Sequence, residues 1–594
     1  MIKKLYPLSN VVLPPPNFLH YKGLFYWHHK DLGNLEQGDV YQFNTWMNLF
    51  GAKKWYAYCD LGEIYLRLNI TGAYQLQIMG TNQNHAFGTS LDSILLDTYI
   101  DTDSEQVSIP DAKNYDGIWF TIYKKSTEPF AINSIQWCTD KTPGTENKLA
   151  IVSCTFKREE YILNNIGKFE NFLTENEALR DKIHLFVIDN GRTLDAGKRY
   201  AHTDILPNMN AGGAGGFTRG MMEAVKSNAG YTRILLMDDD IDVLPESYFR
   251  TLIVSNYLRE EYRDAFISGA MMEMVSKHWL FEALAFQKGD WVKGVYSGMD
   301  VLRLENILKI NTVQDKLFSE KKVFSGWWYN CFPVSFIHEK GLPLPFFIRC
   351  DDVEWGWRHQ GKHHIALNGI CVWHEPFMWK VPPLTDRYYH HRNVFIVWSI
   401  YIDDFKNTYK KFLTDVFYFL LKTYNYNDID LLFRALDDVL AGPQMLKQNP
   451  ELLHKELQSM VKKPEYFDAE IREIEYAKTY YPPRKKRKIV FKLTRHGKYC
   501  PQFLWEKESN ALEWYPPMDN FMLVKTVKVY NLLTGKYCIR KYDRKRMIVF
   551  EKEFKARMKQ IKARFDDLKK EYTKAHKELT SFEFWEKYLE LNHE

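Results

Sequence analysis

An apolar run that ends in three consecutive carboxylates constrains the fold of this 594-residue chain more than any other feature. The run Ile234–Met237 leads directly into Asp238, Asp239 and Asp240. Four consecutive apolar residues are typical of a buried strand in a parallel sheet. Ligand sites in open α/β sheets lie at the carboxyl ends of such strands. Because side chains alternate along a strand, we expect Asp238 and Asp240 on one side and Asp239 on the other.

Two carboxylates on one side of a strand end suit a hard divalent cation. Mg²⁺ or Mn²⁺ held by Asp238 and Asp240 keeps coordination positions open for a substrate diphosphate. That is the chemistry of an enzyme that uses a nucleotide-activated donor. The alternative is an acidic turn that caps a helix, since Asp is common at helix starts. The triplet by itself leaves both interpretations open.

Length, charge and cysteine usage limit the number of domains, the class of partner and the cellular compartment that we expect. A chain of 594 residues is expected to form two to four domains. The net charge of +5 does not favour a nucleic-acid binder. Eight cysteines without a CxxC pair predict reduced thiols in a cytoplasmic protein. The start Met1–Leu5 lacks the apolar region of a signal peptide, and no apolar run approaches the ~20 residues of a membrane span, so we expect a soluble or peripheral protein.

Residues 1–145 contain short alternating aromatic segments bounded by turn residues, without a long helical period. This pattern predicts an antiparallel β-sandwich or jelly roll that ends in a linker at residues 140–145. The segments that carry the prediction are residues 55–58, 64–70, 74–78 and 118–123.

Residues 146–400 change character. The runs 150–154 and 185–188 resemble buried parallel strands, with a helical stretch at 159–178 and another helix after residue 216. Strand–helix alternation of this kind predicts a doubly wound, Rossmann-like α/β domain. We expect residues 401–594 to form a mainly helical domain.

The last part of the chain carries an apolar stripe with steps of four and three, the heptad pattern of one helix. We expect the stripe to pack on the protein itself or on a second subunit. Its members are Phe554, Met558, Ile561, Phe565, Leu568, Tyr572, Ala575 and Leu579.

Two further segments of the α/β region suit a ligand. Asp189 ends the strand 185–188, where an acid commonly bonds a ribose or a base edge; a turn formed by Asp-Asn-Gly is the alternative. The segment Asn208–Gly220 has four glycines in five positions, which permit close backbone approach before a helix begins. Its free amides suit an anionic or hydroxyl-rich ligand. It is not a P-loop, because no Gly-Lys-Ser/Thr follows, and a flexible hinge is the alternative.

Later segments add aromatic and acidic groups. Trp327 and Trp328 form an aromatic ledge that is suited to stacking against a sugar or to core packing. Asp351 with Glu354 three residues on fits a helix N-cap and its box partner. Asp352 has no such structural explanation, and a carboxylate at a helix start can act as a general base toward a hydroxyl.

His374 follows the apolar run Ile370–Val372. A lone histidine is more often a satisfied structural group. Here the acidic triplet still needs a third protein ligand, which favours a metal-binding role for His374.

Together these motifs resemble the GT-A glycosyltransferases, and more narrowly the galactofuranosyltransferases that build bacterial galactan. The flanking β-sandwich and helical region fit the same resemblance, although only about 250 central residues carry specific motifs. In chain order the motifs are Thr155–Arg158, Asp189-Asn190, Asn210–Gly220, Asp238–Asp240, Trp327-Trp328, Asp351-Asp352 and Trp373-His374.

The resemblance implies a role for each donor-side residue. Arg158, Asp189 and Asn190 are expected to contact the uridine diphosphate. Asp238, Asp240 and His374 are expected to hold Mn²⁺ or Mg²⁺, which neutralises the leaving diphosphate. Asp239 is expected to face the donor sugar.

On the acceptor side, the resemblance implies that Trp327 and Trp328 shape a groove, with Asp351 beside them. Asp352 is expected to deprotonate the acceptor hydroxyl as it attacks the anomeric carbon, inverting the configuration in one displacement. Positions that line the sugar pocket match His278, Glu282 and His391.

The chain departs from the family pattern at Tyr388–Asn393, and its basic region after residue 480 does not align. Our leading hypothesis is a metal-dependent inverting transferase of galactofuranose from UDP-galactofuranose onto a lipid-linked glycan in cell-wall polysaccharide synthesis. The alternatives are another inverting hexosyl- or rhamnosyltransferase and a non-catalytic glycan-binding protein. A nucleotidyltransferase would need a basic residue in the glycine segment, where Arg219 is the only candidate.

The expected partners are a UDP-sugar donor, a glycan or glycolipid acceptor and a second copy of the chain, without nucleic acid. The basic run Arg484–Lys488 suggests contact with an anionic membrane surface, where each nearby Lys or Arg contributes ~1 kcal/mol; a solvated loop is the alternative. The expected location is the cytoplasm, peripheral on the inner face of the cell membrane.

Overall fold

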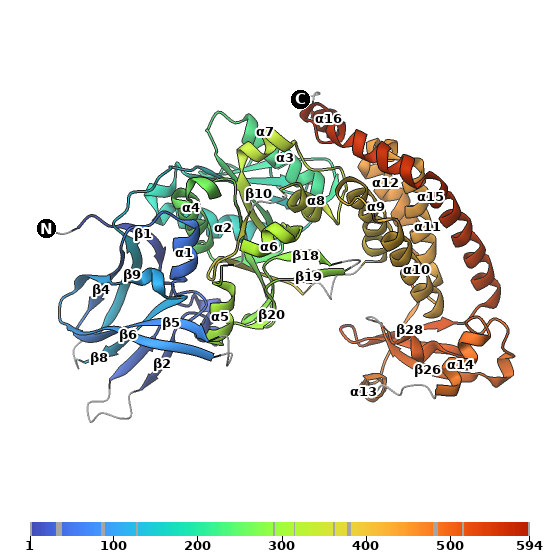
Figure 1. Ribbon diagram of the computed structural model, residues 1–594, viewed down its shortest axis with the longest axis horizontal. Coiled ribbons are helices and arrows are strands. Elements are labelled where there is room, and N and C mark those ends of the chain that lie inside the picture. Colours follow the sequence, from blue (N-terminus) through green and yellow to red (C-terminus); the bar gives the residue numbers. More distant parts are fainter. Residues whose placement is uncertain are drawn as a thin grey trace. The chain divides into compact units, whose positions relative to one another are not determined.

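The computed structural model describes residues 3–30, 38–84, 89–125, 129–288, 291–313, 315–359, 363–376, 382–478, 485–513 and 516–591. The chain forms two compact units. The first comprises Met1–Pro343 and Asp352–Pro376, and the second comprises Leu344–Asp351 and Phe377–Glu594. The class is mixed α/β, as expected (Figure 1). The division into three domains at residues 145 and 400 stays a prediction.

Two antiparallel sheets form the N-terminal part of the first unit. One has the order β1-β9-β4-β7 and the other β2-β3-β8-β5-β6. They meet through Phe120 and Trp137, one from each sheet, whose ring centroids are 5.8 Å apart. The strands are β1 Tyr6–Asn10, β2 Trp27–Lys30, β3 Asp39–Gln42, β4 Ile64–Thr71, β5 Tyr74–Asn84, β6 Thr89–Ile100, β7 Ser104–Ile109, β8 Gly117–Lys124 and β9 Ala131–Thr139.

One expected strand of this region is a helix. Residues 55–58 lie in α1 (Ala52–Tyr58) because Trp55 and Tyr58, three residues apart, share one helical face and are both buried. The ring of Trp55 stacks on Phe50 at 5.4 Å. A four-residue aromatic run fits both a helical face and strand alternation. The burial of Trp55 and Tyr58 on one face favours the helix.

The central sheet of the first unit has seven strands in the order β12-β11-β10-β13-β22-β15-β23. Strands β10 to β13 run parallel to one another, and β22 is antiparallel to β13. The helices packed around it are α2 Glu159–Glu175, α3 Gly212–Lys226 and α4 Glu246–Tyr257. The strands are β10 Leu149–Thr155, β11 Ile183–Asp189, β12 Thr203–Pro207, β13 Arg233–Asp238, β15 Phe266–Ser268, β22 Tyr329–Pro333 and β23 His364–Ile365.

A second sheet of the α/β part has the order β14-β24-β16-β17-β20, and a third has the order β19-β18-β21. Their strands are β14 Ile241–Val243, β16 Ala270–Glu273, β17 Trp279–Glu282, β18 Ala285–Lys288, β19 Trp291–Gly294, β20 Ser297–Asp300, β21 Val323–Phe324 and β24 Cys371–His374. The nearby helices are α5 Leu304–Ile310, α6 Asp315–Glu320, α7 Val334–Lys340 and α8 Asp351–Arg358.

A hydrophobic core cluster of the first unit joins its N-terminal part to its α/β part. It contains Trp46 and Trp119 from the N-terminal part and Trp373 from the α/β part. The side-chain amide of Asn368 donates to the backbone carbonyls of Trp46 and Leu49 at 2.9 and 2.8 Å. The β-sheets before residue 145 and the α/β region after it therefore share buried contacts.

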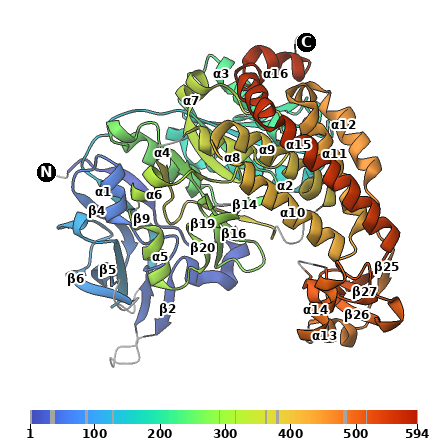
Figure 2. The same cartoon turned by 45° about the vertical axis from the view of Figure 1, so that its right-hand side comes forward.

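The second unit is built around the long helix α15, Arg544–Leu579, which lies beside α9 and α11 (Figures 1 and 2). Its apolar stripe contacts other helices of this unit: Phe554 stacks on Phe417 of α10 at 4.0 Å, and Phe565 meets Phe395 of α9 at 5.8 Å. The stripe therefore packs on the protein itself. The other helices are α9 His390–Tyr401, α10 Lys406–Lys422, α11 Tyr426–Ala441, α12 Pro450–Met460, α13 Ile471–Lys478, α14 Lys485–Leu493 and α16 Phe582–Tyr588.

The second unit also contains a sheet, which the expectation of a mainly helical region missed. Its order is β25-β28-β27-β26, with β25 Tyr466–Asp468, β26 Glu506–Leu512, β27 Val524–Asn531 and β28 Lys536–Lys541. The alternation of buried Val527 and Val529 with Lys528 is a strand signal, and Gly535 at φ +65° permits the turn to β28. Within the residues that the structure describes, no helix has the length and apolarity needed to cross a bilayer.

Candidate metal centre and donor site

The carboxyl ends of three parallel strands meet at one edge of the seven-stranded sheet. Cys154 of β10 pairs with Asp238 of β13, and Thr155 pairs with Asp189 of β11. The strand order reverses between β10 and β13, which is where open α/β sheets form their ligand crevice. Tyr329 of the antiparallel β22 lies opposite Met237, so the residues just before it reach the same edge.

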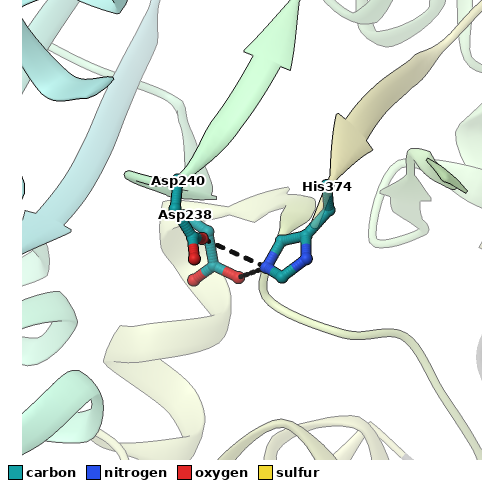
Figure 3. Close-up of side chains that lie close together, drawn as sticks. All are labelled: Asp238, Asp240 and His374. Atoms are coloured by element: carbon teal, nitrogen blue, oxygen red, sulfur yellow. Dashed lines mark ion pairs between the residues drawn. The ribbon is translucent and has the colours of Figure 1, made fainter. Parts of the chain in front are cut away.

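Asp238, Asp240 and His374 converge at this edge (Figure 3). The Nε2 atom of His374 lies 3.1 Å from Oδ1 of Asp240 and 3.7 Å from Oδ2 of Asp238. One ligand atom from each residue lies within 4.8 Å of the other two. In the part of the chain that the structure describes, this is the one group of three such side chains with that spacing.

Hydrogen bonding fixes the orientation of the His374 ring. Its Nδ1 lies 2.5 Å from the backbone carbonyl of Glu375, to which it donates, so Nε2 faces the two carboxylates. Burial by itself lowers the pKa of His374. The hydrogen bond and charge of Asp240, with the charge of Asp238, outweigh burial and raise that pKa. The cluster therefore favours positive charge at its centre.

The middle carboxylate of the triplet has a different environment. Burial, followed by the charge of Asp240, raises the pKa of Asp239 to about 6. Asp239 is not part of the three-residue cluster. Its expected contact with a donor sugar stays a prediction.

Arg158 links the end of β10 to the cluster. Its Nη1 lies 3.2 Å from Oδ2 of Asp240 and 3.9 Å from Oε2 of Glu375. The hydroxyl of Tyr161 donates to Oε1 of Glu375 at 2.5 Å, and this bond, with burial, raises the pKa of Tyr161 to about 12. Neither Tyr161 nor Glu375 was among the residues predicted from the sequence. The available signals were their positions, one helical turn after Arg158 and directly after His374.

Asp189 shapes the loop that follows β11. Its side chain is 1% exposed and accepts hydrogen bonds from the backbone N–H groups of Gly191 at 2.9 Å and of Thr193 and Leu194 at 2.7 Å. This geometry agrees with the alternative of a turn-forming Asp. The contact of Asp189 with a nucleotide stays a prediction.

Asn190 ties the glycine segment to the sheet. Its Nδ2 donates to the carbonyl of Gly212 at 2.8 Å, and its Oδ1 accepts from Nδ2 of Asn208 at 2.8 Å. Both bonds are buried. The side chain thereby positions the start of α3, and its expected nucleotide contact stays a prediction.

The glycines at positions 212, 213, 215 and 216 form the first turn of α3. They are not a loop ahead of a helix that starts after residue 216. A Cβ atom on Gly216 would lie 2.1 Å from Sγ of Cys154, and one on Gly220 would lie 2.1 Å from Cγ1 of Val152. These two glycines therefore let the helix pack closely on β10. Gly213 has no atom within 4 Å of its Cβ position and faces open space.

The two tryptophans of the expected ledge are buried, at 5% exposure for Trp327 and 7% for Trp328. Trp328 Nε1 donates to the carbonyl of Gly269 at 3.1 Å, and Trp327 lies edge-on to Phe217 at 5.4 Å. In this structure they pack in the core, which was the alternative interpretation. Their role in an acceptor groove stays a prediction.

Helix α8 begins at Asp351, and Asp351 and Asp352 are both partly exposed. The buried carboxylate of Glu354 pairs with Arg358, at 2.5 Å from Nη2 and 3.0 Å from Nε, an ion pair one helical turn apart. The capping box of Asp351 and Glu354 stays a prediction. Arg358 also donates to the carbonyl of Leu342 at 2.8 Å.

Three of the four residues before Asp351 have an unusual backbone. Phe347 and Arg349 have φ values of +71°, and Cys350 has +64°, a region that L-residues rarely adopt. In the second unit, Nδ2 of Asn393 donates to the carbonyls of Ile348 and Arg349 at 3.0 and 2.8 Å. The side-chain amide of Asn393 on α9 therefore stabilises the strained loop just before Asp352.

The three residues matched to a sugar pocket are divided between the units. Glu282 lies on β17 of the first unit; its carboxylate has no hydrogen-bond or ion-pair partner among the described residues, and burial raises its pKa to about 7. His278 lies just before β17 and is partly buried. His391, in the second unit, is 2% exposed, stacks on Phe412 at 5.3 Å and has no hydrogen-bond partner for either ring nitrogen in the described chain.

Comparison with known proteins identifies relatives of this chain. Residues 534–591 match the family described as Galactofuranosyltransferase-2, domain 3. The protein named Galactofuranosyltransferase GlfT2 from Mycobacterium tuberculosis (strain ATCC 25618 / H37Rv) is 26% identical over 433 residues, which cover 68% of this chain and 65% of that protein. Its namesake from Mycolicibacterium smegmatis is 24% identical over 439 residues, covering 68% and 64%.

The chain thus spans just under two thirds of the length of these curated relatives. Among solved structures, the mannosyltransferase PcManGT from Pyrobaculum calidifontis, in complex with GDP-Man and Mn²⁺, matches at 10% identity over 54% of this chain and 87% of that one, with a TM-score of 0.28. These matches show that the chain is similar in sequence to proteins named galactofuranosyltransferases.

Proposed function

We propose that this chain is a metal-dependent inverting glycosyltransferase that transfers galactofuranose from UDP-galactofuranose to a hydroxyl of a glycan acceptor. The observation that carries the proposal is the cluster of Asp238, Asp240 and His374 at the sheet crevice of a chain related to galactofuranosyltransferases. The identity of the donor rests on the name of those relatives.

The residues of the cluster fit a divalent cation. Two carboxylates and one imidazole supply oxygen and nitrogen ligands. His374 Nε2 lies 3.1 and 3.7 Å from the nearest oxygens of Asp240 and Asp238, and two ligands ~2.1 Å from one ion are at most ~4.2 Å apart. The hydrogen bond from His374 Nδ1 to the backbone carbonyl of Glu375 holds the ring with Nε2 toward the carboxylates. A bound Mn²⁺ or Mg²⁺ would supply the positive charge that stabilises the departing diphosphate.

The chain's own residues would perform the remaining steps. The Asp352 carboxylate accepts the proton of the acceptor hydroxyl while that oxygen bonds to the anomeric carbon of galactofuranose. The bond from the anomeric carbon to the diphosphate breaks on the opposite face, so the configuration inverts and UDP leaves. Arg158 supplies positive charge beside the diphosphate.

The test is UDP release by the purified protein with Mn²⁺ or Mg²⁺, given UDP-galactofuranose or UDP-galactopyranose and a galactofuranosyl acceptor. We expect turnover with the furanose donor alone, and its loss in Asp352→Asn, which keeps the shape of the side chain. Release from neither donor contradicts the proposed donor and favours another hexosyl- or rhamnosyltransferase. Full activity of Asp352→Asn excludes Asp352 as the base.

No specific observation favours the remaining alternatives. A nucleotidyltransferase would use Arg219 for the departing pyrophosphate, and the guanidinium of Arg219 is paired with Glu223 at 2.7 Å. A purely glycan-binding protein requires neither the carboxylate–histidine cluster nor Asp352.

We further propose an anionic membrane surface as a partner of the second unit. Between α14 and residue 504, the side chains of Leu493, Phe503 and Leu504 are 78%, 81% and 65% exposed, beside exposed Lys492 and Arg495. Apolar side chains among basic ones are typical of a surface that rests on acidic lipid headgroups.

Two residues of the basic run have acidic partners: Arg487 pairs with Glu506 and Lys488 with Asp519, each at 2.7 Å. Arg484 and the side chains of Lys485 and Lys486 lie outside the described part of the chain. The proposed location is the cytoplasm, on the inner face of the cell membrane, which the free thiols of all eight cysteines support.

Vesicle flotation tests the membrane proposal. We expect binding to vesicles that contain acidic phospholipid, and its loss when Leu493, Phe503 and Leu504 are all changed to Ser. The matched control changes the exposed Leu91 and Ile94 of β6 to Ser. Equal binding by all three proteins contradicts the proposed surface. The predicted homo-oligomer gains no support from the heptad stripe, because that stripe is buried within its own unit.

A further inference from the structure

Arg158 lies between two carboxylates, that of Asp240 in the candidate metal site and that of Glu375 outside it. Its Nη1 is 3.2 Å from Oδ2 of Asp240, whose other oxygen faces His374, and 3.9 Å from Oε2 of Glu375. The Arg158 side chain is 34% exposed, so its guanidinium has room to change partner. In this arrangement Arg158 neutralises one of the residues that would hold the metal.

Glu375 is held in place independently of Arg158. Its Oε1 accepts from the hydroxyl of Tyr161 at 2.5 Å, and its backbone carbonyl accepts from Nδ1 of His374 at 2.5 Å. Its Oε2 lies on the Arg158 side, 3.9 Å from Nη1 of that residue. The guanidinium also lies 5.9 Å from the centre of the Tyr161 ring, which favours a cation at this position. A second, preformed site for Arg158 therefore exists beside the first.

We propose that Arg158 and the divalent metal compete for Asp240, and that metal binding shifts Arg158 onto Glu375. The inference rests on the metal site of the proposed function. Two cations on one carboxylate repel each other strongly in a partly buried site, because Coulomb energies are less screened there than in water. Glu375 provides the displaced guanidinium with a countercharge, so Glu375 assists metal binding without being a ligand. Glu375 is thus a positioning residue.

The consequence is a specific coupling between two side chains. Replacing Arg158 removes the competitor, so the chain should bind metal more tightly. Replacing Glu375 removes the alternative site, so metal binding should weaken, but only while Arg158 is present to compete. A carboxylate that merely adds negative charge, or that binds the metal directly, would help equally in either background.

A double-mutant cycle on Mn²⁺ binding alone, measured by titration calorimetry or by the electron paramagnetic resonance of free Mn²⁺, tests this coupling. We expect Arg158→Gln to bind Mn²⁺ roughly 10-fold more tightly and Glu375→Gln roughly 5-fold more weakly, within the range of coupled neighbours. In the Arg158→Gln background, Glu375→Gln should change the affinity by less than about 2-fold. Equal losses in both backgrounds, or no tightening in Arg158→Gln, would overturn the proposal.

Two controls separate competition from general charge effects. Arg158→Lys keeps a competing cation and should return the affinity toward that of the wild type. Lys168→Gln removes a cation that pairs with Asp242, two residues beyond Asp240, and should leave Mn²⁺ affinity unchanged. Tightening in Lys168→Gln equal to that in Arg158→Gln would contradict direct competition.

The same measurements separate this inference from the proposed function. A wild-type chain that binds no Mn²⁺ contradicts both. A chain that shows the predicted cycle but transfers no sugar retains the competition and loses the transferase assignment. Circular dichroism and thermal unfolding of each variant establish that the changes have not disturbed the fold.

Discussion

Ile241 lies directly opposite His374 in the antiparallel pairing of β14 with β24. This register brings the imidazole of His374 to 3.1 Å from Asp240, the residue immediately before Ile241, although 134 positions separate the two in sequence. Because β24 is also paired to β16 in parallel, the histidine is held by a strand in the interior of its sheet. Backbone pairing therefore positions His374 beside Asp240 in the candidate metal site.

The first prediction concerns removal of a metal ligand. We expect His374→Ala to weaken Mn²⁺ binding at least roughly 100-fold, the upper range for loss of even an outer-shell partner. Transfer activity should fall in parallel, and a chelator should abolish wild-type activity until Mn²⁺ is restored. His184→Ala, which removes another imidazole paired with an aspartate at 3.0 Å, is the matched control and should bind Mn²⁺ normally. Unchanged Mn²⁺ affinity in His374→Ala would exclude the metal site.

The second prediction is a pH-dependent stability. Burial raises the pKa of Glu282 from 4.5 to about 7, so the folded chain binds this proton more tightly than the unfolded chain does. Below pH 4.5 the carboxyl group is neutral in both the folded and the unfolded chain. As the pH rises from 4.5 to 7, ionisation stabilises the unfolded chain first, so the free energy of unfolding falls by up to about 3 kcal/mol. We therefore expect Glu282→Gln to match the wild type below pH 4.5 and to unfold at a higher temperature above pH 7.

Thermal unfolding followed by tryptophan fluorescence at several pH values measures this difference. Glu223→Gln, which changes a partly exposed carboxylate paired with Arg219, is the control, and its effect should not grow between pH 4.5 and 7. A difference between Glu282→Gln and the wild type that is constant across pH would show that the carboxyl group does not titrate near 7.

The third prediction concerns the glycines of α3. Gly216→Ala and Gly220→Ala each place a methyl group 2.1 Å from an atom of β10, and we expect a loss of about 1–3 kcal/mol of unfolding free energy for each overpacked site. Gly213→Ala faces open space and is the matched control, with an expected gain of up to about 1 kcal/mol from helix propensity. Chemical denaturation compares the three. Destabilisation of the same size at all three positions would contradict the packing explanation.

The fourth prediction concerns the strained loop before Asp352. Asn393→Ala removes hydrogen bonds to the carbonyls of Ile348 and Arg349, so the loop should relax toward ordinary φ values. Asp352 follows this loop directly, and misplacement of a catalytic group by about 1 Å costs on the order of 100-fold in rate. We therefore expect the turnover number of Asn393→Ala to fall by about 10- to 100-fold with Mn²⁺ affinity unchanged.

The control for this prediction is Ser399→Ala on the same helix. The buried hydroxyl of Ser399 bonds only to the carbonyl of Phe395 in its own helix, so its loss should leave the rate within about 2-fold of the wild type. A normal rate in Asn393→Ala would indicate that Asp352 is positioned without this loop.

Some elements were predictable because the local pattern of apolar residues indicates which of their faces are buried. The apolar runs at 150–154 and 234–237 lie in β10 and β13, since a parallel strand covered on both faces needs consecutive apolar residues. The heptad stripe of α15 is equally local, because a helix of 36 residues repeats its apolar face many times. Short mixed segments carried too few repeats, which is why α1 and the sheet of the second unit were missed.

Local sequence patterns were sufficient to predict the α/β class, the acidic edge of the sheet and the residue types gathered there. They did not predict that Glu354 pairs with Arg358, that Arg158 contacts Asp240, or that the heptad stripe packs on its own unit. The two kinds of feature differ in the sequence distance over which they are decided. Periodicity and strand ends depend on neighbours within a few residues, whereas ion pairs and helix partners depend on which distant surfaces are buried against each other.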